Sequence, residues 1–328
     1  MKAIVYRNYG SPDILQWEEI EKPVPGDDEV LIKVRAASLN PLDWKMMKGV
    51  PFVLRLLGIG TTKLKHPGVD VAGEVEAVGR NVTQFRPGDR VFGTCVGAFA
   101  EYATSKSATG MKSALVLKPA NVTFEQAASA PVAALTALQG LRDHGRIQPG
   151  QAVLIHGAAG GVGTFAVQIA KAFGAKVTGV CSARNVEMVR SIGADEAIDY
   201  TKQDFTQGGQ RYDMILDCVG DHALSACRHA LNPSGILVLV GALADASMPA
   251  FLARVLGALL VSPFVSRKMR FFIANVNQQD LITVSEFLAS GKVRPVIDRC
   301  YRFSEAREAF RYAERGHTRG KVILTPDQ

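Results

Sequence analysis

A strand, a glycine-rich turn and a helix follow one another between residues 152 and 173, and this succession restricts the fold more than any other feature. The apolar run AVLIH leads into GAAGGVG, where Gly157, Gly160 and Gly163 recur every third residue, and TFAVQIAKAFG follows. The first N–H groups of such a helix lack intrahelical partners, and its dipole favours an anion. Glycines let a pyrophosphate approach the backbone. The turn therefore predicts a dinucleotide site, with a tight turn that binds nothing as the alternative.

Strands and helices alternate on both sides of this turn. The Ala-rich segment NVTFEQAASAPVAALTALQGL is helical in pattern, with Asn121 or Thr123 as its N-cap. After the turn, KVTGV, YDMILD and GILVLVG are strand-like, whereas NVEMVRSIG and HALSACRHAL are helical. Strands at this spacing with helical crossovers predict a doubly wound parallel sheet. We assign residues 124–274 to this α/β domain.

The first third of the chain has a different pattern. Short β-branched runs (AIVY, EVLIKVRAAS, GVDVAGEVEAVG, DRVFG) are separated by Pro-Gly turns, which is typical of a barrel-like domain. The tail holds two helical segments and two short strands, and we expect it to complete the first domain. The predicted division is therefore residues 1–123 with 275–328, and residues 124–274. A length of 328 residues suits two domains.

The end of the second strand of the α/β domain bears on the choice of dinucleotide. An acidic residue usually lies there and binds the ribose 2′-hydroxyl of NAD. This chain instead reads GVCSAR, with Ser182 and Arg184 and no carboxylate. A serine and an arginine can bind a 2′-phosphate, which an acid would repel. The sequence favours NADP(H), with a solvated loop charge as the alternative for Arg184.

Charge and cysteine usage narrow the partners and the compartment. The net charge is +7, but the basic residues are scattered and form no nucleic-acid motif. The five cysteines are widely spaced without a CxxC pair, which argues against a disulfide framework. MKAIVYRNYG does not read as a signal peptide, and Phe251–Val265 is shorter than a membrane span. We expect a cytoplasmic protein without an integral membrane segment.

The first domain offers few metal ligands. The candidates are Cys95, His66, Asp43, Asp70 and Glu74, and a cage built from them is poorly motivated. His66 is better explained as a turn residue and Cys95 as a small buried side chain. We expect no metal.

Seven stretches carry a family resemblance over essentially the whole chain. They are SLNPLDWKMMKG (38–49), HPGVDVAGEVEAVGRNVTQFRPGDRVFG (66–93), AASAPVAALTAL (127–138), HGAAGGVGTFAVQIAKAFGAKVTGVCS (156–182), SIGADEAIDY (191–200), GKVRPVID (291–298) and RGHTRGKVIL (315–324). With them the chain resembles the medium-chain dehydrogenase/reductases, in particular the zinc-free quinone oxidoreductases and their mitochondrial reticulon-interacting group. The zinc-containing relatives have a Gly-His-Glu stretch where this chain has Gly68-Val69-Asp70.

The resemblance implies a GroES-like catalytic domain, a Rossmann domain and a nicotinamide between them. It implies that Asn40 and Thr136 lie near the nicotinamide ribose, and these two, with Asp43 beside Asn40, are the candidate catalytic residues. It also implies cofactor contacts from Ala159, Gly160, Gly161 and Val162 at the pyrophosphate; Ser182, Arg184 and Tyr200 at the 2′-phosphate; Cys218, Val219, Leu243, Phe272 and Ile273 at the nicotinamide; and His317 and Arg319 from the tail. A homodimer is a further implication.

Without a metal, hydride transfer depends on positioning and on hydrogen bonds to the developing oxyanion. A quinone or an α,β-unsaturated carbonyl suits this chemistry because its negative charge is delocalised. The proton comes by default from solvent, with Asp43, Lys45 and His66 as alternatives, and Asp43 is equally a structural cap. The apolar stretches 50–59 and 249–265 suggest a lipophilic substrate, a subunit contact or, for the second, a membrane surface. The competing functions are a zinc-type alcohol dehydrogenase and a non-catalytic NADPH-binding interaction protein.

Overall fold

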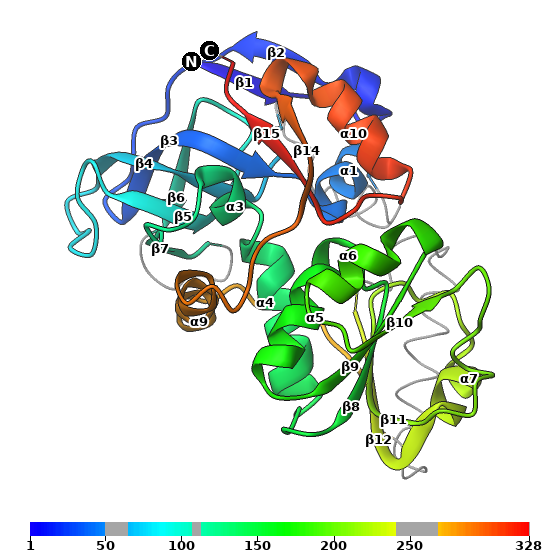
Figure 1. The fold of residues 1–328 in the computed structure, drawn as a ribbon. Helices are drawn as coiled ribbons and strands as arrows, with labels where there is room; N and C mark the ends of the chain where they lie inside the picture. Colours follow the sequence, from blue (N-terminus) through cyan, green and yellow to red (C-terminus); the bar gives the residue numbers. More distant parts are fainter. Residues whose placement is uncertain (50–64, 107–112, 241–267, 328) are drawn as a thin grey trace. The chain divides into compact units, whose positions relative to one another are not determined.

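Two large β-sheets of different construction organise the structure, a computed structural model that describes residues 1–49, 65–106, 113–240 and 268–327 (Figure 1). The chain divides into two units, each described here by itself. Unit 1 comprises Met1–Leu135, Asn275–Gly291 and Pro295–Gln328, and unit 2 comprises Thr136–Ala274 and Lys292–Arg294.

Unit 1 is built around a largely antiparallel sheet with the strand order β14-β15-β3-β4-β5-β7, and β6 also pairs with β3. Only the pair β14 and β15 is parallel among these. The strands are β3 (Glu29–Ser38), β4 (Asp70–Val78), β5 (Arg90–Thr94), β6 (Tyr102–Lys106), β7 (Leu115–Leu117), β14 (Ile297–Arg302) and β15 (Lys321–Thr325), with a separate pair of β1 (Lys2–Val5) and β2 (Gln16–Glu19). The β-rich first third is therefore confirmed.

Helices close the core of unit 1. They are α1 (Pro41–Lys48), α3 (Phe124–Ala128), α9 (Gln278–Ala289) and α10 (Ala306–Glu314). Helix α10 places Phe310 in the core, where its ring meets Phe99 edge-on at a centroid distance of 6.0 Å. Strand β15, from the tail, pairs with β3, so the last residues of the chain complete the sheet of the first domain.

Unit 2 contains a parallel sheet with the strand order β10-β9-β8-β11-β12-β13. The strands are β8 (Ala152–His156), β9 (Lys176–Cys181), β10 (Glu196–Asp199), β11 (Tyr212–Asp217), β12 (Leu231–Leu239) and β13 (Lys268–Phe271); the helices are α5 (Gly161–Ala172), α6 (Val186–Ser191) and α7 (Leu224–His229). This is the doubly wound order, in which the direction of winding reverses beside β8. The predicted Rossmann fold is confirmed.

The Ala-rich segment after residue 121 is broken, where the sequence suggested one continuous helix. Thr123 caps α3 by accepting the N–H of Gln126, and α3 ends at Ala128. Helix α4 then begins at Pro131 and runs to Gln139, followed by a π-helical turn from Gly140 to His144. A proline disfavours helical backbone at the residue before it, which explains the break.

The boundary between the units lies after Leu135, later than the expected boundary at residue 123. The reason is that α3 packs on β3, β4, β5 and β15, so it belongs to unit 1. Leu243 and the apolar stretches 50–59 and 249–265 lie outside the described residues. None of the helices formed by the described residues is long and apolar enough to cross a membrane.

Candidate functional site

The glycine turn joins β8 to α5 under tight steric conditions. Gly157 has a φ of 81°, in the left-handed region, and a Cβ there would lie 2.7 Å from Cγ2 of Val219. A Cβ on Gly163 would lie 2.0 Å from the carbonyl oxygen of Gly157. Gly157 and Gly163 are therefore required by the fold, because the first turn of α5 passes directly over the end of β8.

Gly160 differs from its neighbours because the fold does not require a glycine there. It is the N-cap of α5 with an ordinary φ of −79°, and among the described residues a Cβ would meet only the Gly157 oxygen, at 3.4 Å. The first turn of the 12-residue helix contains no acidic residue, and no side chain in the described part of the chain caps it. The described residues thus leave room for a side chain at Gly160, at the positive end of the α5 dipole, which fits a pyrophosphate.

The end of β9 is where the sequence predicts the 2′-phosphate contacts. The N–H of Tyr200 donates to the carbonyl of Cys181 at 3.0 Å, so Tyr200 is brought to the end of the strand that leads into Ser182. The hydroxyl of Ser182 accepts a hydrogen bond from the amide of Asn185 at 3.1 Å, and its proton can still be donated. Arg184 and Tyr200 are both exposed.

Sequence reasoning missed Asp199, which lies beside this site. Its Cα pairs in register with Cys181, one strand away from the predicted phosphate contacts. Hydrogen bonds from Thr201 hold the pKa of the Asp199 carboxyl below its usual range, so it is ionised. The sequence signal was the acid directly before Tyr200, at the end of β10.

The residues predicted around the nicotinamide have different surroundings. Burial and the adjacent Asp217 carboxylate raise the pKa of Cys218, which keeps its thiol protonated. Phe272 is buried, and its ring stacks on His144 at a centroid distance of 4.2 Å, whereas Ile273 is 78 % exposed. Val219 packs on Gly157 and so adjoins the glycine turn.

Unit 1 contains a buried polar cluster that joins two predicted catalytic residues to two others. The side-chain amide of Asn40 donates to Asp70 at 2.9 Å, and its oxygen accepts from the Lys321 ammonium at 2.7 Å. Lys321 also lies 3.7 Å from the Asp70 carboxylate. The backbone N–H of Asn40 donates to Asp43 at 2.7 Å, so Asp43 caps α1. Because Lys321 begins β15, the tail contributes the one cation in this cluster of four.

Asp70 links the cluster to the start of α4. Its second carboxylate oxygen accepts the N–H of Val132 at 3.0 Å, in the first turn of that helix. Thr136 lies one turn further along α4, is 8 % exposed, and is the first residue of unit 2. The carboxylate of Asp70 therefore stabilises the positive end of the helix that carries Thr136.

Burial controls the protonation of Asp43. Burial raises the pKa of its carboxyl from 3.8 to about 7, although the N–H groups of Asn40 and Gly68 oppose this shift. Burial likewise raises the pKa of Asp70, against the attraction of Lys321. A neutral Asp43 leaves Asp70 and Lys321 as a charge-balanced pair.

The raised pKa of Asp43 predicts a pH effect on stability. Between the unfolded pKa of 3.8 and the folded pKa of about 7, the folded state keeps a proton that the unfolded state has released. The free energy of unfolding attributable to Asp43 therefore falls as pH rises through this window, by up to about 1.4 kcal/mol per pH unit, and is level above it. Urea unfolding at several pH values measures this for the native chain and for Asp43→Asn. A stability difference between the two that does not change with pH would contradict the raised pKa.

The described residues do not offer a zinc site in unit 1. The oxygens of Asp43 and Asp70 are taken by N–H groups and by Lys321, which already supplies the positive charge. Glu74 pairs with Arg35 at 2.8 Å, and burial raises the pKa of Cys95, which keeps its thiol protonated. These residues do not fit a catalytic zinc ion.

The remaining predicted residues lie at the surface of unit 1. His66 and Arg319 are exposed, and Arg319 donates its backbone N–H to Asp298 at 2.9 Å. His317 is exposed, and its ring nitrogen Nδ1 is 2.5 Å from the carbonyl of Arg315. Lys45 is half-buried on α1.

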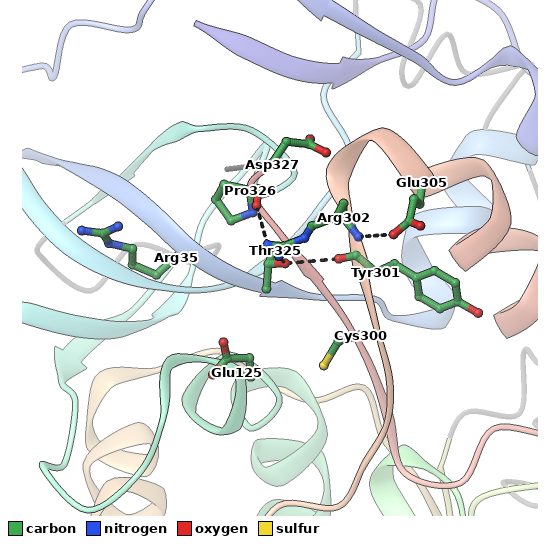
Figure 2. Close-up of a pocket in the computed structure, with 9 residues that line it drawn as sticks. All are labelled: Arg35, Glu125, Cys300, Tyr301, Arg302, Glu305, Thr325, Pro326 and Asp327. Atoms are coloured by element: carbon green, nitrogen blue, oxygen red, sulfur yellow. Dashed lines mark hydrogen bonds between the residues drawn. The ribbon is translucent and has the colours of Figure 1, made fainter.

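A separate hollow of about 650 Å³ lies on unit 1 (Figure 2). It is lined by Arg35, Glu125, Cys300, Tyr301, Arg302, Glu305, Thr325, Pro326 and Asp327, none of which is a predicted site residue. Arg302 already donates to Glu305 and to the carbonyl of Pro326, as the dashed lines show. The polar groups that line the hollow are thus largely engaged in hydrogen bonds within the protein, so we do not assign a ligand to the hollow.

Comparison with known proteins shows the family to which this chain belongs. A model of the alcohol dehydrogenase GroES-like domain matches residues 26–121, and a zinc-binding dehydrogenase model matches residues 192–324. The chain is 35 % identical over 343 residues to the chloroplastic NADPH-dependent alkenal/one oxidoreductase of Arabidopsis thaliana, with 99 % of this chain and 80 % of that protein covered. The chain belongs to the medium-chain dehydrogenase/reductase family, in its quinone oxidoreductase branch. It is an oxidoreductase, as the sequence predicted.

Two further members of the family are similar over nearly the whole chain. The mitochondrial NAD(P)H oxidoreductase RTN4IP1 of Mus musculus is 34 % identical over 373 residues, with 99 % of this chain and 89 % of that protein covered. The structure of the quinone oxidoreductase from Coxiella burnetii superposes with a TM-score of 0.86 at 31 % identity, covering 100 % of this chain and 99 % of that one. The resemblance to the reticulon-interacting group is thereby confirmed.

Proposed function

We propose that this quinone oxidoreductase homologue is an NADPH-dependent, zinc-independent reductase of quinones or α,β-unsaturated carbonyl compounds. The observation that carries the proposal is the unit 2 turn, where Gly160 leaves room at the N-terminus of α5 that the fold itself does not need. A glycine turn that leads into a helix N-terminus binds phosphate groups through its N–H groups and the helix dipole. The names of the Arabidopsis and mouse relatives agree with a reduced nicotinamide cofactor.

Different residues of the chain would bind different parts of this cofactor. The N–H groups of Ala159, Gly161 and Val162 would hold the pyrophosphate. Gly160, whose own N–H donates to the Gly157 carbonyl at 3.0 Å, would contact it through its backbone. Ser182, Arg184 and Tyr200 would hold the 2′-phosphate, with a serine hydroxyl, a guanidinium and an exposed phenol hydroxyl as donors. NADPH, when bound, supplies a hydride. Nearby Asp199 opposes the 2′-phosphate, so the preference for NADPH depends on Arg184.

The class of hydride acceptor follows from whether the residues of unit 1 can stabilise the negative charge that develops on it. Both polar atoms of the Asn40 side chain are used inside the cluster, and Asp43 is 4 % exposed between two N–H donors. These residues therefore position the backbone and the start of α4 rather than exchange protons. With no Lewis acid among them, the acceptor must delocalise negative charge itself, as a quinone, an enal or an enone does. We propose that its proton comes from solvent.

The test is the oxidation of NADPH and NADH with a panel of acceptors. The panel contains a benzoquinone, a naphthoquinone, a prenylated quinone, an enal, an enone and a simple ketone. Turnover of quinones or enones, and not of the ketone, is the expected result. Ketone turnover that depends on bound zinc would instead favour an alcohol dehydrogenase, and NADPH binding without any turnover would favour a sensor protein.

Arg184→Ala is expected to raise the KM for NADPH about ten-fold, because it removes a charge-assisted contact. The KM for NADH should stay the same, since NADH has no 2′-phosphate. Arg190→Ala is the matched control, because Arg190 is also exposed and lies on the neighbouring helix α6. Steady-state kinetics with both cofactors measure the effect. Equal losses for NADPH and NADH would refute the assignment of Arg184 to the 2′-phosphate.

The proposed function comes with expectations about the cellular compartment and the oligomeric state. All five cysteines are unpaired, which suits a reducing compartment such as the cytoplasm, although the relatives compared above are named as chloroplastic and mitochondrial. A homodimer is the expected assembly, and light scattering of the purified protein measures it.

A further inference from the structure

Two histidines and three carboxylates gather at the ends of β8 and β11 in unit 2, outside the residues that the proposed function uses. His156 ends β8 and Asp217 ends β11; Asp221 and His222 follow in the next loop. Ligand atoms of His156, Asp221 and His222 all lie within 4.8 Å of one another, and this is the one such group of three found among the described residues. The arrangement calls for an explanation, since the dinucleotide turn does not need it.

His156 is held in a defined orientation. Its side chain is 4 % exposed, and its Nδ1 lies 2.9 Å from the Asp217 carboxylate, which is 1 % exposed. That carboxylate also accepts the N–H groups of Val219 and Gly220, so its position is fixed and it faces His156 as a hydrogen-bond acceptor. Asp217 therefore keeps the proton on Nδ1 and leaves the lone pair on Nε2. This Nε2 lies 3.6 Å from the Asp221 carboxylate, beyond hydrogen-bond distance.

His222 is held in a similar way from the other side. Its Nδ1 lies 2.6 Å from the same Asp221 oxygen, and its Nε2 lies 3.4 Å from the Asp204 carboxylate. Asp204 is itself fixed by the N–H and hydroxyl of Thr206. The ring of Phe205 packs against both imidazoles, with centroid distances of 5.2 Å to His156 and 4.8 Å to His222.

We propose that His156 Nε2, His222 Nδ1 and one Asp221 oxygen bind a divalent transition-metal ion, with Zn²⁺ as the best fit. Two imidazoles and a carboxylate suit this ion. Each imidazole has a carboxylate behind its other nitrogen, Asp217 for one and Asp204 for the other, which is the usual outer arrangement of a metal-binding histidine. Tetrahedral zinc ligands lie about 3.4 Å apart, so a small rotation of His222 suffices.

The charge and the access also suit a metal ion. Zn²⁺ would replace the hydrogen bond between His222 Nδ1 and Asp221 at 2.6 Å, and the imidazole proton would then lie on Nε2, which faces the Asp204 carboxylate. The side chains of Asp221 and His222 are 58 % and 23 % exposed, so the ion can enter from solvent and a water can complete its coordination. The buried His156 would bind the ion from the side that faces the protein interior.

This site is distinct from the catalytic zinc of zinc-containing dehydrogenases, whose ligands would lie in unit 1. Its consequence is structural. The ion would fasten the loop after β11 to the end of β8, and Val219 in this loop packs on Gly157 of the dinucleotide turn. Metal binding should therefore stabilise the turn, whether or not the enzyme turns over.

The experiment uses the full chain without a histidine tag. Isothermal titration with Zn²⁺ gives stoichiometry and affinity, and Co²⁺ absorption reports the ligand type. His222→Gln and Asp221→Asn each remove one ligand from a partly exposed position, so both variants should fold. His229→Gln is the matched control, because it removes an exposed imidazole at the end of the neighbouring helix α7.

We expect one equivalent of Zn²⁺, a rise in the thermal midpoint with the ion, and a loss of affinity of at least about ten-fold in both ligand variants. Asp204→Asn, which alters only the carboxylate behind His222, should weaken binding by about ten-fold. His229→Gln should bind like the native chain. No binding to the native chain, unchanged affinity in His222→Gln, or a thiolate charge-transfer band with Co²⁺ would each overturn the proposal.

Discussion

Replacing Lys321 with methionine is expected to lower the free energy of unfolding of unit 1 by about 3–5 kcal/mol, the usual result of removing one partner of a buried ion pair. The side chains of Lys321 and Asp70 are 4 % and 0 % exposed. Methionine matches the volume of the lysine stem, so the cost comes from charge rather than from a cavity. The variant leaves the Asp70 carboxylate without its cation and the Asn40 oxygen without its donor.

A second substitution separates charge from packing. Asp70→Asn in the Lys321→Met background removes the unpaired carboxylate, so the double variant should recover a large part of the loss. Both tryptophans, Trp17 and Trp44, pack against the core of unit 1, so urea unfolding followed by their fluorescence reports this unit. Lys22→Met, which breaks an exposed pair with Glu76, is the control and should change little. A Lys321→Met variant as stable as the native chain would show that the buried pair is not ionised.

The glycine turn was predictable because its signal is local. A strand, three spaced glycines and a helix within about 20 residues leave little choice of geometry. The left-handed Gly157 and the close approach at Gly163 are what that pattern predicts. The capping role of Asp43 was likewise open to prediction, because Asn40, Pro41 and Asp43 form a helix start within one turn.

The buried cluster was not predictable in the same way. Sequence reasoning named Asn40 and Asp43 but gave Asp70 only as a metal candidate, and it left Lys321 out. Lys321 reaches the cluster because β15 pairs with β3, and no pattern in one sequence reveals which strands pair across the whole chain. The same holds for His222, whose meeting with His156 depends on how the loop after β11 folds back.

At two places, different features of the sequence favoured different predictions. The Ala-rich pattern after residue 121 predicted one helix, whereas Pro131 carried the signal for the break that the structure contains. The absence of an acid at the end of β9 favoured NADP(H), but the neighbouring strand brings Asp199 to the same edge of the sheet. A sheet places residues side by side that a linear reading treats separately.

Gly160→Ala and Gly163→Ala are expected to differ sharply, and this difference is the second large effect. In Gly163→Ala the new Cβ would lie 2.0 Å from the backbone oxygen of Gly157, so the turn must shift. Such overpacking costs about 1–3 kcal/mol of unit 2 stability, and NADPH affinity should be lost with the geometry of the turn. In Gly160→Ala the Cβ meets one atom of the described residues, at 3.4 Å, so stability should stay near that of the native chain.

The affinity of Gly160→Ala for NADPH should nevertheless fall by about ten- to one hundred-fold, because the methyl group occupies the space in which a diphosphate would accept the N–H groups of α5. Gly208→Ala is the matched control, since Gly208 lies on an exposed loop of unit 2. Within the part of the chain that the structure describes, a Cβ there meets only the end of the Gln203 side chain. Circular dichroism melting measures stability, and NADPH fluorescence titration measures affinity. If Gly160→Ala binds NADPH normally, the diphosphate does not lie at this helix. If it binds weakly and also melts early, Gly160 serves the fold, and the argument that its space is reserved for a ligand fails.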